Sequence, residues 1–430
     1  MTPEVKKRIE QIRQGIVPEG YKKGKIGIVP IKWNEVPFST LFTSTSEYTD
    51  DLKQYPLYSL TIEDGITAKT ERYERSHLVK KENSYKVVRP NDYAYNPMNI
   101  RFGAVARHKG DIPVAVSGYY DIFTTVHESD LVFMDSFLTY GPMITYYNKV
   151  STGSLVEKQR VHFSDFLEFS LALPPLEERK KIAEILSTQD KAIELQERKI
   201  EELKRFKKGC LERMFPREGQ KVPEKRFPGF TGDWEQRKVS TIASDTRGGG
   251  TPATSNETYW SGNIPWIQSS DLSEGKLFGV EPRKYISRDG LNNSATQLVP
   301  ENSIAVVTRV GVGKLAFMPF SYTTSQDFLS LCKLQTEPHF TVYALYQMLQ
   351  GELQAVQGTS IKGMTKDDLL SKSIFAPKDE VEQQQLGSYF RNLDTLITLH
   401  QRKLEEMKKQ KKALMQLLLT GIVKTKGEVR

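Results

Sequence analysis

The sequence contains only two cysteines, Cys210 and Cys332, and six histidines among 430 residues. Two thiols in separate halves of the chain cannot build a thiolate metal site, so we expect both to stay free in a reducing compartment. The histidines are scattered, without the i, i+4 spacing that lets two imidazoles of one helix share a zinc ion. The sequence therefore predicts no metal centre.

Long apolar runs are also absent. No segment approaches the roughly 18 consecutive apolar residues that are needed to cross a bilayer, and the first residues, Met-Thr-Pro-Glu-Val-Lys-Lys-Arg, lack the apolar stretch of a signal peptide. We therefore expect a cytoplasmic protein without a membrane partner. The hydrophobic fraction of 38% is large enough for packed cores. The net charge of +8 is too small to indicate a nucleic-acid partner by itself.

Catalytic motifs are the third absence. A DNA methyltransferase needs a glycine-rich cofactor loop and an Asn/Asp-Pro-Pro-aromatic motif beside the flipped base. Segment 96–99, Asn-Pro-Met-Asn, lacks the second proline and the aromatic residue. Pro252 interrupts the helix that should follow the glycines of 247–252, and segment 310–315 lacks the spacing of a phosphate-binding loop. We predict a chain that is not an enzyme, with a stand-alone DNA methyltransferase or nuclease whose motifs are unrecognised as the alternative.

The chain does contain an internal repeat, which is the most informative feature of its sequence. Residues 182–215 align with 386–419 without gaps, so that Asp190 matches Asp394 and the apolar and polar positions agree together. A proline precedes each of these segments, and a Val-Pro-Glu run followed by a tryptophan occurs before each half. The chain begins partway through its repeating unit, and we therefore expect its two ends to lie near each other.

Each repeat combines a β-rich part with a long helix. Short β-type runs broken by Gly, Pro, Asn and Asp are typical of mixed, mostly β domains. The clearest runs are Tyr85–Val88, Ala104–Ala106, Val114–Val116, Ser303–Val307 and Phe328–Cys332. We predict an α+β fold in which two such domains are separated by two long helices, related by a pseudo-twofold repeat.

The two long helices carry a heptad pattern of apolar residues with charged flanks, which indicates a coiled coil. The predicted seam includes Ile193, Ile200 and Leu203 in the first helix and Ile397, Leu404 and Met407 in the second. If the repeats are related by a dyad, the helices pair antiparallel, with Lys207 and Lys411 at matching seam positions. A helix of 34 residues would form a rod of about 50 Å. The alternative is that each helix packs separately on its own domain.

These patterns divide the chain into seven segments. We predict an N-terminal helical piece (1–20), a first β-rich domain (21–172), a first long helix (173–216), a linker (217–232), a second β-rich domain (233–374), a second long helix (375–420) and a tail (421–430).

Polar clusters in the loops of both domains have the composition of DNA contacts. Arg, Lys and Gln donors fit base edges, and hydroxyl groups suit phosphates. The predicted contact residues are Lys69, Arg72, Arg75, Lys80, Arg101, Arg107, Arg160, Arg247, Thr251, Ser255, Tyr259, Gln268, Arg309, Lys314 and Lys362. A coiled-coil scaffold without a DNA role is a further alternative, but it leaves these clusters unexplained.

Several motifs give the whole chain a resemblance to the specificity subunits of type I restriction–modification systems. They are Gly249-Gly-Thr-Pro252, Tyr259-Trp-x-Gly-x-Ile-Pro-Trp266, Leu173-Pro-Pro-Leu-Glu-Glu178 and Gly358-Thr-Ser-Ile-Lys-Gly-Met364. Segment 33–172 resembles the family only in outline, because it lacks the Gly-Gly-Thr-Pro loop.

The resemblance implies that two target recognition domains each read one half of a bipartite, asymmetric site in double-stranded DNA. It also implies two modification subunits and two restriction subunits as partners. S-adenosylmethionine, ATP and magnesium would then be bound by those partners, and this chain would bind no cofactor directly.

Overall fold

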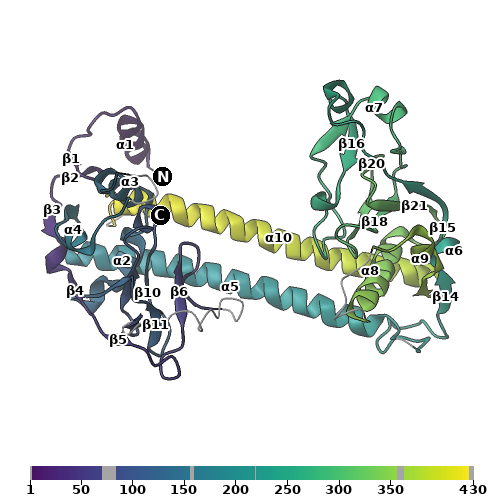
Figure 1. Cartoon of the computed structure of the whole chain (residues 1–430), viewed down its shortest axis with the longest axis horizontal. Coiled ribbons are helices and arrows are strands. Elements are labelled where there is room, and N and C mark those ends of the chain that lie inside the picture. The colour runs from purple at the N-terminus through teal and green to yellow at the C-terminus, as the bar shows by residue number, and fades with distance from the viewer. Residues whose placement is uncertain (1, 70–83, 155–158, 218, 356–362, 426–430) are drawn as a thin grey trace. The chain divides into compact units, whose positions relative to one another are not determined.

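The computed structural model describes residues 2–69, 84–154, 159–217, 219–355 and 363–425, and the chain falls into two compact units. Unit 1 contains Met1–Gln196 and Lys403–Arg430, and unit 2 contains Glu197–Arg402. Helix α5 (Leu176–Met214) and helix α10 (Glu380–Leu419) therefore each contribute one part to either unit (Figure 1).

Unit 1 combines short strands with short helices. Its strands are β1 (Tyr21–Gly24), β2 (Gly27–Pro30), β3 (Asn34–Pro37), β4 (Phe42–Ser44), β5 (Tyr48–Thr49), β6 (Tyr58–Thr61), β7 (Gly65–Ala68), β8 (Tyr85–Val88), β9 (Tyr93–Tyr95), β10 (Val105–Arg107), β11 (Val114–Ser117), β12 (Asp121–Thr125) and β13 (Ser170–Leu173). Its helices, besides parts of α5 and α10, are α1 (Pro3–Arg13), η1 (Phe38–Thr40), η3 (Ile100–Phe102), η4 (Glu128–Asp130), α2 (Leu131–Phe137), α3 (Gly141–Val150) and α4 (Phe163–Leu167).

Unit 2 is built from the same kinds of element. Its strands are β14 (Glu235–Lys238), β15 (Ala243–Gly248), β16 (Ile264–Ile267), β17 (Lys284–Ile286), β18 (Ser303–Val307), β19 (Leu315–Met318), β20 (Thr323–Thr324), β21 (Phe328–Leu334) and β22 (Ser373–Ala376). Its shorter helices are α6 (Val239–Ile242), η6 (Glu257–Trp260), η7 (Ser269–Asp271), α7 (Arg288–Asn292), α8 (Pro338–Ala355) and α9 (Lys366–Ser371).

The main sheets of the two units have the same topology. In unit 1 the strand order is β4-β12-β9-β10, and in unit 2 it is β15-β21-β18-β19, with antiparallel pairing throughout. Each unit also has a two-stranded antiparallel sheet, β3-β13 in unit 1 and β14-β22 in unit 2. Because the same pairings recur in the same chain order, the internal repeat of the sequence is also a repeat of structure.

The strand predictions agree closely with the structure. The runs Tyr85–Val88 and Ser303–Val307 are β8 and β18 with unchanged bounds, and Phe328–Cys332 lies within β21. Helix α8 was not recognised in the sequence. Its Phe340, Tyr343 and Leu349 are buried in the core of unit 2, and a helix with such a broad apolar surface lacks the amphipathic pattern that distinguishes it from strands.

Each unit has an aromatic core that also covers one part of each long helix. In unit 1, Phe38, Phe123 and Phe166 pack with Leu186 of α5 and Leu418 of α10. In unit 2, the core includes Cys210 and Met214 of α5, and Leu386 and Phe390 of α10. Both helices are therefore fixed to both units by apolar burial, which is the main source of helix stability in folded proteins.

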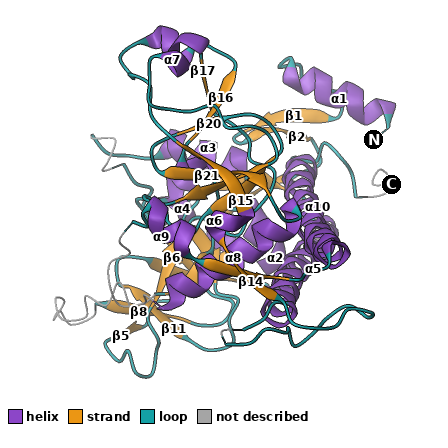
Figure 2. Cartoon of the chain, turned by 90° about the vertical axis from the view of Figure 1, so that its right-hand side faces the viewer, coloured by secondary structure: helices purple, strands orange, loops and turns teal. Residues whose placement is uncertain are grey.

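The two long helices are antiparallel neighbours within each unit (Figure 1, Figure 2). In unit 1, Lys411 of α10 forms an ion pair with Asp190 of α5. In unit 2, Lys207 of α5 forms an ion pair with Asp394 of α10, with 2.5 Å between Nζ and Oδ1. The four residues are repeat equivalents, so each lysine binds the aspartate of the other repeat. This reciprocal arrangement supports the predicted antiparallel coiled coil with a pseudo-twofold relation.

The seam positions differ in exposure along the helices. Ile193, Ile200 and Ile397 are buried, whereas Leu203, Leu404 and Met407 are half-buried. Gln196 and Lys207 are polar seam residues that are also buried. Buried polar side chains in a helix pair favour one register over others, because a shifted register leaves them without partners.

The segments near the two chain ends meet in unit 1 (Figure 1). The Tyr21 hydroxyl donates to the carbonyl of Gly421 at 2.7 Å, and Arg8 donates to the carbonyl of Ile422. In unit 2, the continuous chain makes the corresponding connection, where Phe215 packs edge-on against Trp234. The sequence-based expectation that the ends lie near each other is confirmed.

The unequal burial of the two ion pairs predicts unequal effects on stability. The side chains of Lys207 and Asp394 are 10% and 21% exposed, and the Tyr343 hydroxyl also donates to Asp394. We expect Asp394→Ala to lower the free energy of unfolding by about 3–5 kcal/mol, since it leaves a nearly buried ammonium group without its carboxylate. The matched variant Asp190→Ala removes a half-exposed carboxylate and should cost about 1 kcal/mol or less. Urea denaturation of the full chain measures both, and equal losses would contradict this assignment.

Candidate nucleic-acid interface

Several loops of unit 2 meet at one end of its main sheet. Gly248, at the end of β15, pairs with Leu329 near the start of β21, and Val307, at the end of β18, pairs with Phe328. The connection from β18 to β19 starts at the same end, because Val306 pairs with Leu315. Consequently the segments 249–256, 308–314 and 325–327 all leave the sheet at this end, which we call the loop end.

Hydrogen bonds join these loops to one another. The Thr251 hydroxyl donates to Oε1 of Gln326 at 2.7 Å, and both side chains are exposed. The backbone N–H of Thr308 donates to the carbonyl of Asp327 at 2.7 Å. The Lys314 ammonium donates to the carbonyl of Ser269 at 3.4 Å, which brings the turn after β16 to the same place. The loop end of unit 2 is therefore a connected surface rather than a set of independent loops.

The two glycines before Thr251 are required by close backbone packing. A Cβ atom on Gly249 would lie 1.8 Å from the carbonyl oxygen of Ser325, and one on Gly250 would lie 2.5 Å from the backbone nitrogen of Thr296. The Gly250 N–H also donates to the carbonyl of Thr324, and Trp266 Nε1 donates to the carbonyl of Gly250. This packing holds the Gly-Gly-Thr-Pro loop against the rest of the loop end.

Four of the predicted contact residues converge here and others do not. Arg309 and Thr251 are exposed at the loop end, and Lys314 and Gln268 are half-buried beside it. Arg247 forms an ion pair with Asp245 on the same strand.

Ser255 lies farther along the segment 249–256 and is exposed, and Tyr259 lies in η6 and is half-buried. The carbonyl of Tyr259 accepts from the Ser287 N–H, and its backbone lies against Gly290 of α7. Lys284, at the start of β17, lies 5.6 Å from the ring centroids of both Trp260 and Trp266.

The corresponding end of the unit 1 sheet has different residues. The loop from β9 to β10 contains Arg101, which is 8% exposed and bonds Gln159 Oε1 through Nη1 at 2.5 Å. The Val161 N–H donates to the carbonyl of Pro97, as the Met364 N–H donates to that of Thr308 in unit 2. Arg160, in a backbone pair with Thr152, is half-buried next to this connection.

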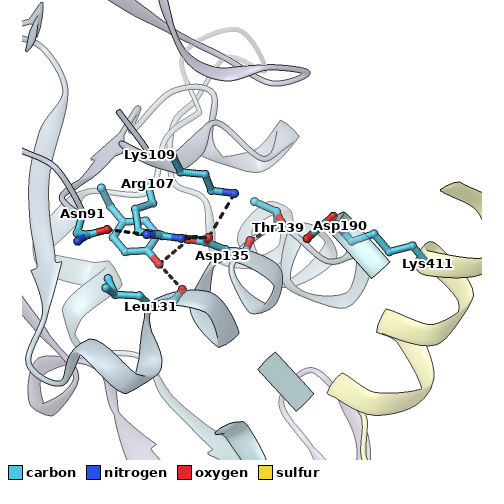
Figure 3. Close-up of polar contacts among 9 residues, drawn as sticks. Asn91, Arg107, Lys109, Leu131, Asp135, Thr139, Asp190 and Lys411 are labelled. Atoms are coloured by element: carbon cyan, nitrogen blue, oxygen red, sulfur yellow. Dashed lines mark hydrogen bonds and ion pairs between the residues drawn. The ribbon is translucent and has the colours of Figure 1, made fainter. Parts of the chain in front are cut away.

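Arg107 lies at the opposite end of the β9–β10 hairpin from Arg101, because it pairs with Tyr93. Its guanidinium holds Asp135 through three hydrogen bonds and also donates to Asn91, as Figure 3 shows. Burial opposes the charge, but the hydrogen bonds and charge of Asp135 outweigh it and raise the pKa of Arg107. Lys109 adds a second cation at Asp135. Arg107 is thus committed to contacts within unit 1 and lies away from Arg101.

The remaining predicted residues are placed as follows. Arg72, Arg75, Lys80 and Lys362 lie outside the described residues, and Lys69 is exposed just after β7. Gln159, which orients Arg101, was not identified in the sequence, because a single glutamine in a loop forms no recognisable pattern. Among the described residues, no three His, Cys, Asp or Glu side chains are grouped closely enough to hold a metal ion. In the same part of the chain, no helix has the length and apolarity needed to cross a membrane.

Comparison with known proteins identifies the family. The type I restriction modification DNA specificity domain matches residues 136–205 and 231–409, more than half of the chain, and the chain belongs to this family. One relative is named as the type I restriction enzyme MjaX specificity subunit of Methanocaldococcus jannaschii. It is 24% identical over 98% of this chain and 93% of its own length. The MjaVIII specificity subunit of the same organism is 26% identical over 61% of this chain and 64% of its own.

Solved structures have the same fold. A chain from a type I restriction–modification system, described in a study of its complex assembly and conformational transition, covers 92% of this chain and 99% of its own length with a TM-score of 0.57 and 18% identity. The specificity subunit from M. genitalium covers 93% and 99%, with a TM-score of 0.55 and 11% identity.

The glycine packing at the loop end gives a test of this arrangement. We expect Gly249→Ala to force the backbone of Ser325 away and to lower stability by about 1–3 kcal/mol, as overpacking does in other proteins. Gly248→Ala is the matched control, because its Cβ would meet nothing within 4 Å. It should change the free energy of unfolding by about 0.5 kcal/mol or less. Thermal unfolding of both variants measures the difference, and a neutral Gly249→Ala would mean that the loop packs less closely.

Proposed function

We propose that this chain selects the DNA sequence for a type I restriction–modification complex, with each unit reading one half of a bipartite, asymmetric site. The observation that carries the proposal is the repeated main sheet, whose loop end has equivalent connections in both units. Different side chains occupy the two ends, with Arg309 and Thr251 in unit 2 and Arg101 and Gln159 in unit 1. Because different donors and acceptors read different base pairs, the two halves of the site should differ in sequence.

The chemistry of the loop end suits the major groove. Arginine and glutamine side chains form paired hydrogen bonds with guanine and adenine edges, respectively. Arg309 and Gln326 are exposed at the loop end of unit 2, and their side chains carry these hydrogen-bonding groups. Lys314, as a point charge, is suited to phosphate and would contribute affinity that falls with rising salt concentration.

Catalysis belongs, in this proposal, to partner subunits. Two modification subunits would supply S-adenosylmethionine and the methyltransferase residues, and two restriction subunits would supply ATP-dependent translocation and DNA cleavage with magnesium. This chain would bind none of these cofactors and act in the cytoplasm. The absence of methyltransferase and phosphate-loop motifs from its sequence supports this division of labour.

The long helices would set the number of unspecified base pairs between the half-sites. Each helix is continuous and fixed to both units. A helix rises 1.5 Å per residue, whereas B-DNA advances about 3.4 Å per base pair. A longer helix should therefore increase the number of unspecified base pairs between the two half-sites.

Exchange of one unit's recognition segment tests the proposed function. We expect replacement of residues 33–172 by the segment of a relative to change one half of the methylated sequence and to preserve the other. The measurement is the map of methylated sites in a genome that carries this chain together with its modification subunits. If both halves of the methylated sequence changed together, the two units would not read their half-sites separately. If the same sites were methylated without this chain, the proposed function would be wrong.

Paired insertions test the role of the helices. Leu195 and Leu399 are repeat equivalents and are 58% and 55% exposed. Four residues inserted after each would add about 6 Å, roughly one turn, and keep each ion pair within its unit. We expect the unspecified gap to grow by one or two base pairs with both half-sites unchanged.

The control for this experiment is a one-residue insertion after the same two leucines. It rotates the following part of each helix by about 100°, which should disrupt helix pairing and abolish methylation. An active four-residue variant with an unchanged gap would mean that the spacing is determined by other parts of the complex.

A further inference from the structure

The same three-residue pattern occurs in the equivalent hairpin loop of both units. The connection between β9 and β10 contains Arg101-Phe102-Gly103, and that between β18 and β19 contains Arg309-Val310-Gly311. Both glycines have positive backbone φ angles, 99° at Gly103 and 91° at Gly311. Residues other than glycine rarely adopt this conformation. Each glycine directly follows the apolar residue, although the pattern begins six residues after the end of β9 and two residues after the end of β18.

The apolar residue of each pattern is exposed to solvent. Val310 is 70% exposed, the largest value among the exposed large hydrophobic residues described, and Phe102 is 52% exposed. We refer to these two residues as the apolar tips. An apolar side chain stabilises a fold when it is removed from water, so neither of these exposed side chains contributes much to the stability of its own unit.

The surroundings of both tips are polar and positively charged. In unit 2, Arg309 precedes the tip and Lys314 follows it in the same loop. In unit 1, the Arg101 guanidinium lies 4.9 Å from the centroid of the Phe102 ring and is itself bonded to Gln159. This stacking limits the orientations of the ring. Each tip is thus a single apolar group on a surface that otherwise suits DNA.

We infer that Phe102 and Val310 each contact an apolar group on the base edges of one half-site. The C5-methyl group of thymine is the apolar group that the major groove presents, and apolar side chains recognise it by contact. In unit 2, the exposed Arg309 and Gln326 would read the adjacent polar edges. This inference rests on the proposed function and adds a thymine preference, one in each half-site, to it.

A protein partner fits these tips less well than DNA does. Protein interfaces have an apolar, charge-depleted centre formed by several residues, whereas each tip is one side chain next to cationic ones. The difference in size also has a consequence. The phenylalanine ring covers more of a base edge than valine does, so the two half-sites should be read with unequal tolerance of substitution.

The experiment combines tip variants with thymine analogues. The full complex with its modification subunits would be assayed for methylation of a DNA duplex containing its mapped site, in which each thymine in turn is replaced by deoxyuridine, which lacks the methyl group. We expect Val310→Ala to slow methylation about tenfold and to be insensitive to deoxyuridine at one thymine of the half-site that unit 2 reads. For the complex without substitutions, deoxyuridine at that position should slow methylation by a similar factor. Phe102→Ala should behave in the same way in the other half-site.

Two exposed valines serve as matched controls. Val126 in unit 1 is 50% exposed at the opposite end of β12, and Val381 in unit 2 is 53% exposed in the first turn of α10. Their alanine variants should methylate at normal rates and keep the deoxyuridine effect. If the tip variant and the thymine analogue together slow methylation by less than the product of their separate factors, the tip contacts the methyl group directly, because the free-energy effects of independent changes add.

Other results would overturn the inference in distinguishable ways. If the tip variants methylate DNA at the same rate as the control variants, the tips do not contact DNA. Slower methylation accompanied by weaker binding of the modification subunits would assign the tips to a protein contact. Normal site selection by the modification subunits without this chain would instead refute the proposed function on which the inference rests.

Discussion

Two reciprocal ion pairs between antiparallel helices are the constraint on which the rest of the structure depends. Each pair joins a lysine of one repeat to the aspartate of the other, Lys207 to Asp394 and Lys411 to Asp190. Either aspartate can be reached only in one register of its helix pair. A charge that is buried without its partner costs several kcal/mol, so the more buried pair, in unit 2, disfavours shifted registers more strongly than the exposed one.

Each unit contains a part of both helices, although unit 1 consists of two separate segments of the chain and unit 2 of one. Leu186 of α5 and Leu418 of α10 enter the core of unit 1, and Met214 and Phe390 enter that of unit 2. The main sheets, packed in these cores, then present their loop ends from a scaffold that is the same in both units. A repeated scaffold with different loops is a physical basis for reading two different DNA sequences with one chain.

The two loop ends achieve this with different local chemistry. Unit 2 uses glycines that allow backbone contact at Gly249 and Gly250, with exposed Arg309 beside them. Unit 1 lacks that loop and instead buries Arg101 against Gln159. What the two share is the exposed apolar residue followed by a glycine of positive φ, at Phe102 and at Val310. Shared backbone geometry with different side chains is what an asymmetric site requires.

The sequence alone determined the repeat, the two long helices and several of the central strands, because hydrophobic periodicity and turn residues act locally along the chain. Asp190 and Asp394 were already recognisable as equivalent, as were Lys207 and Lys411. Only the tertiary structure decided which predicted cations face outward. Arg309 and Arg107 look alike in the sequence, yet one is exposed in a hairpin loop and the other holds Asp135. The exposure of an arginine depends on carboxylates that are distant in the chain, which no local pattern reveals.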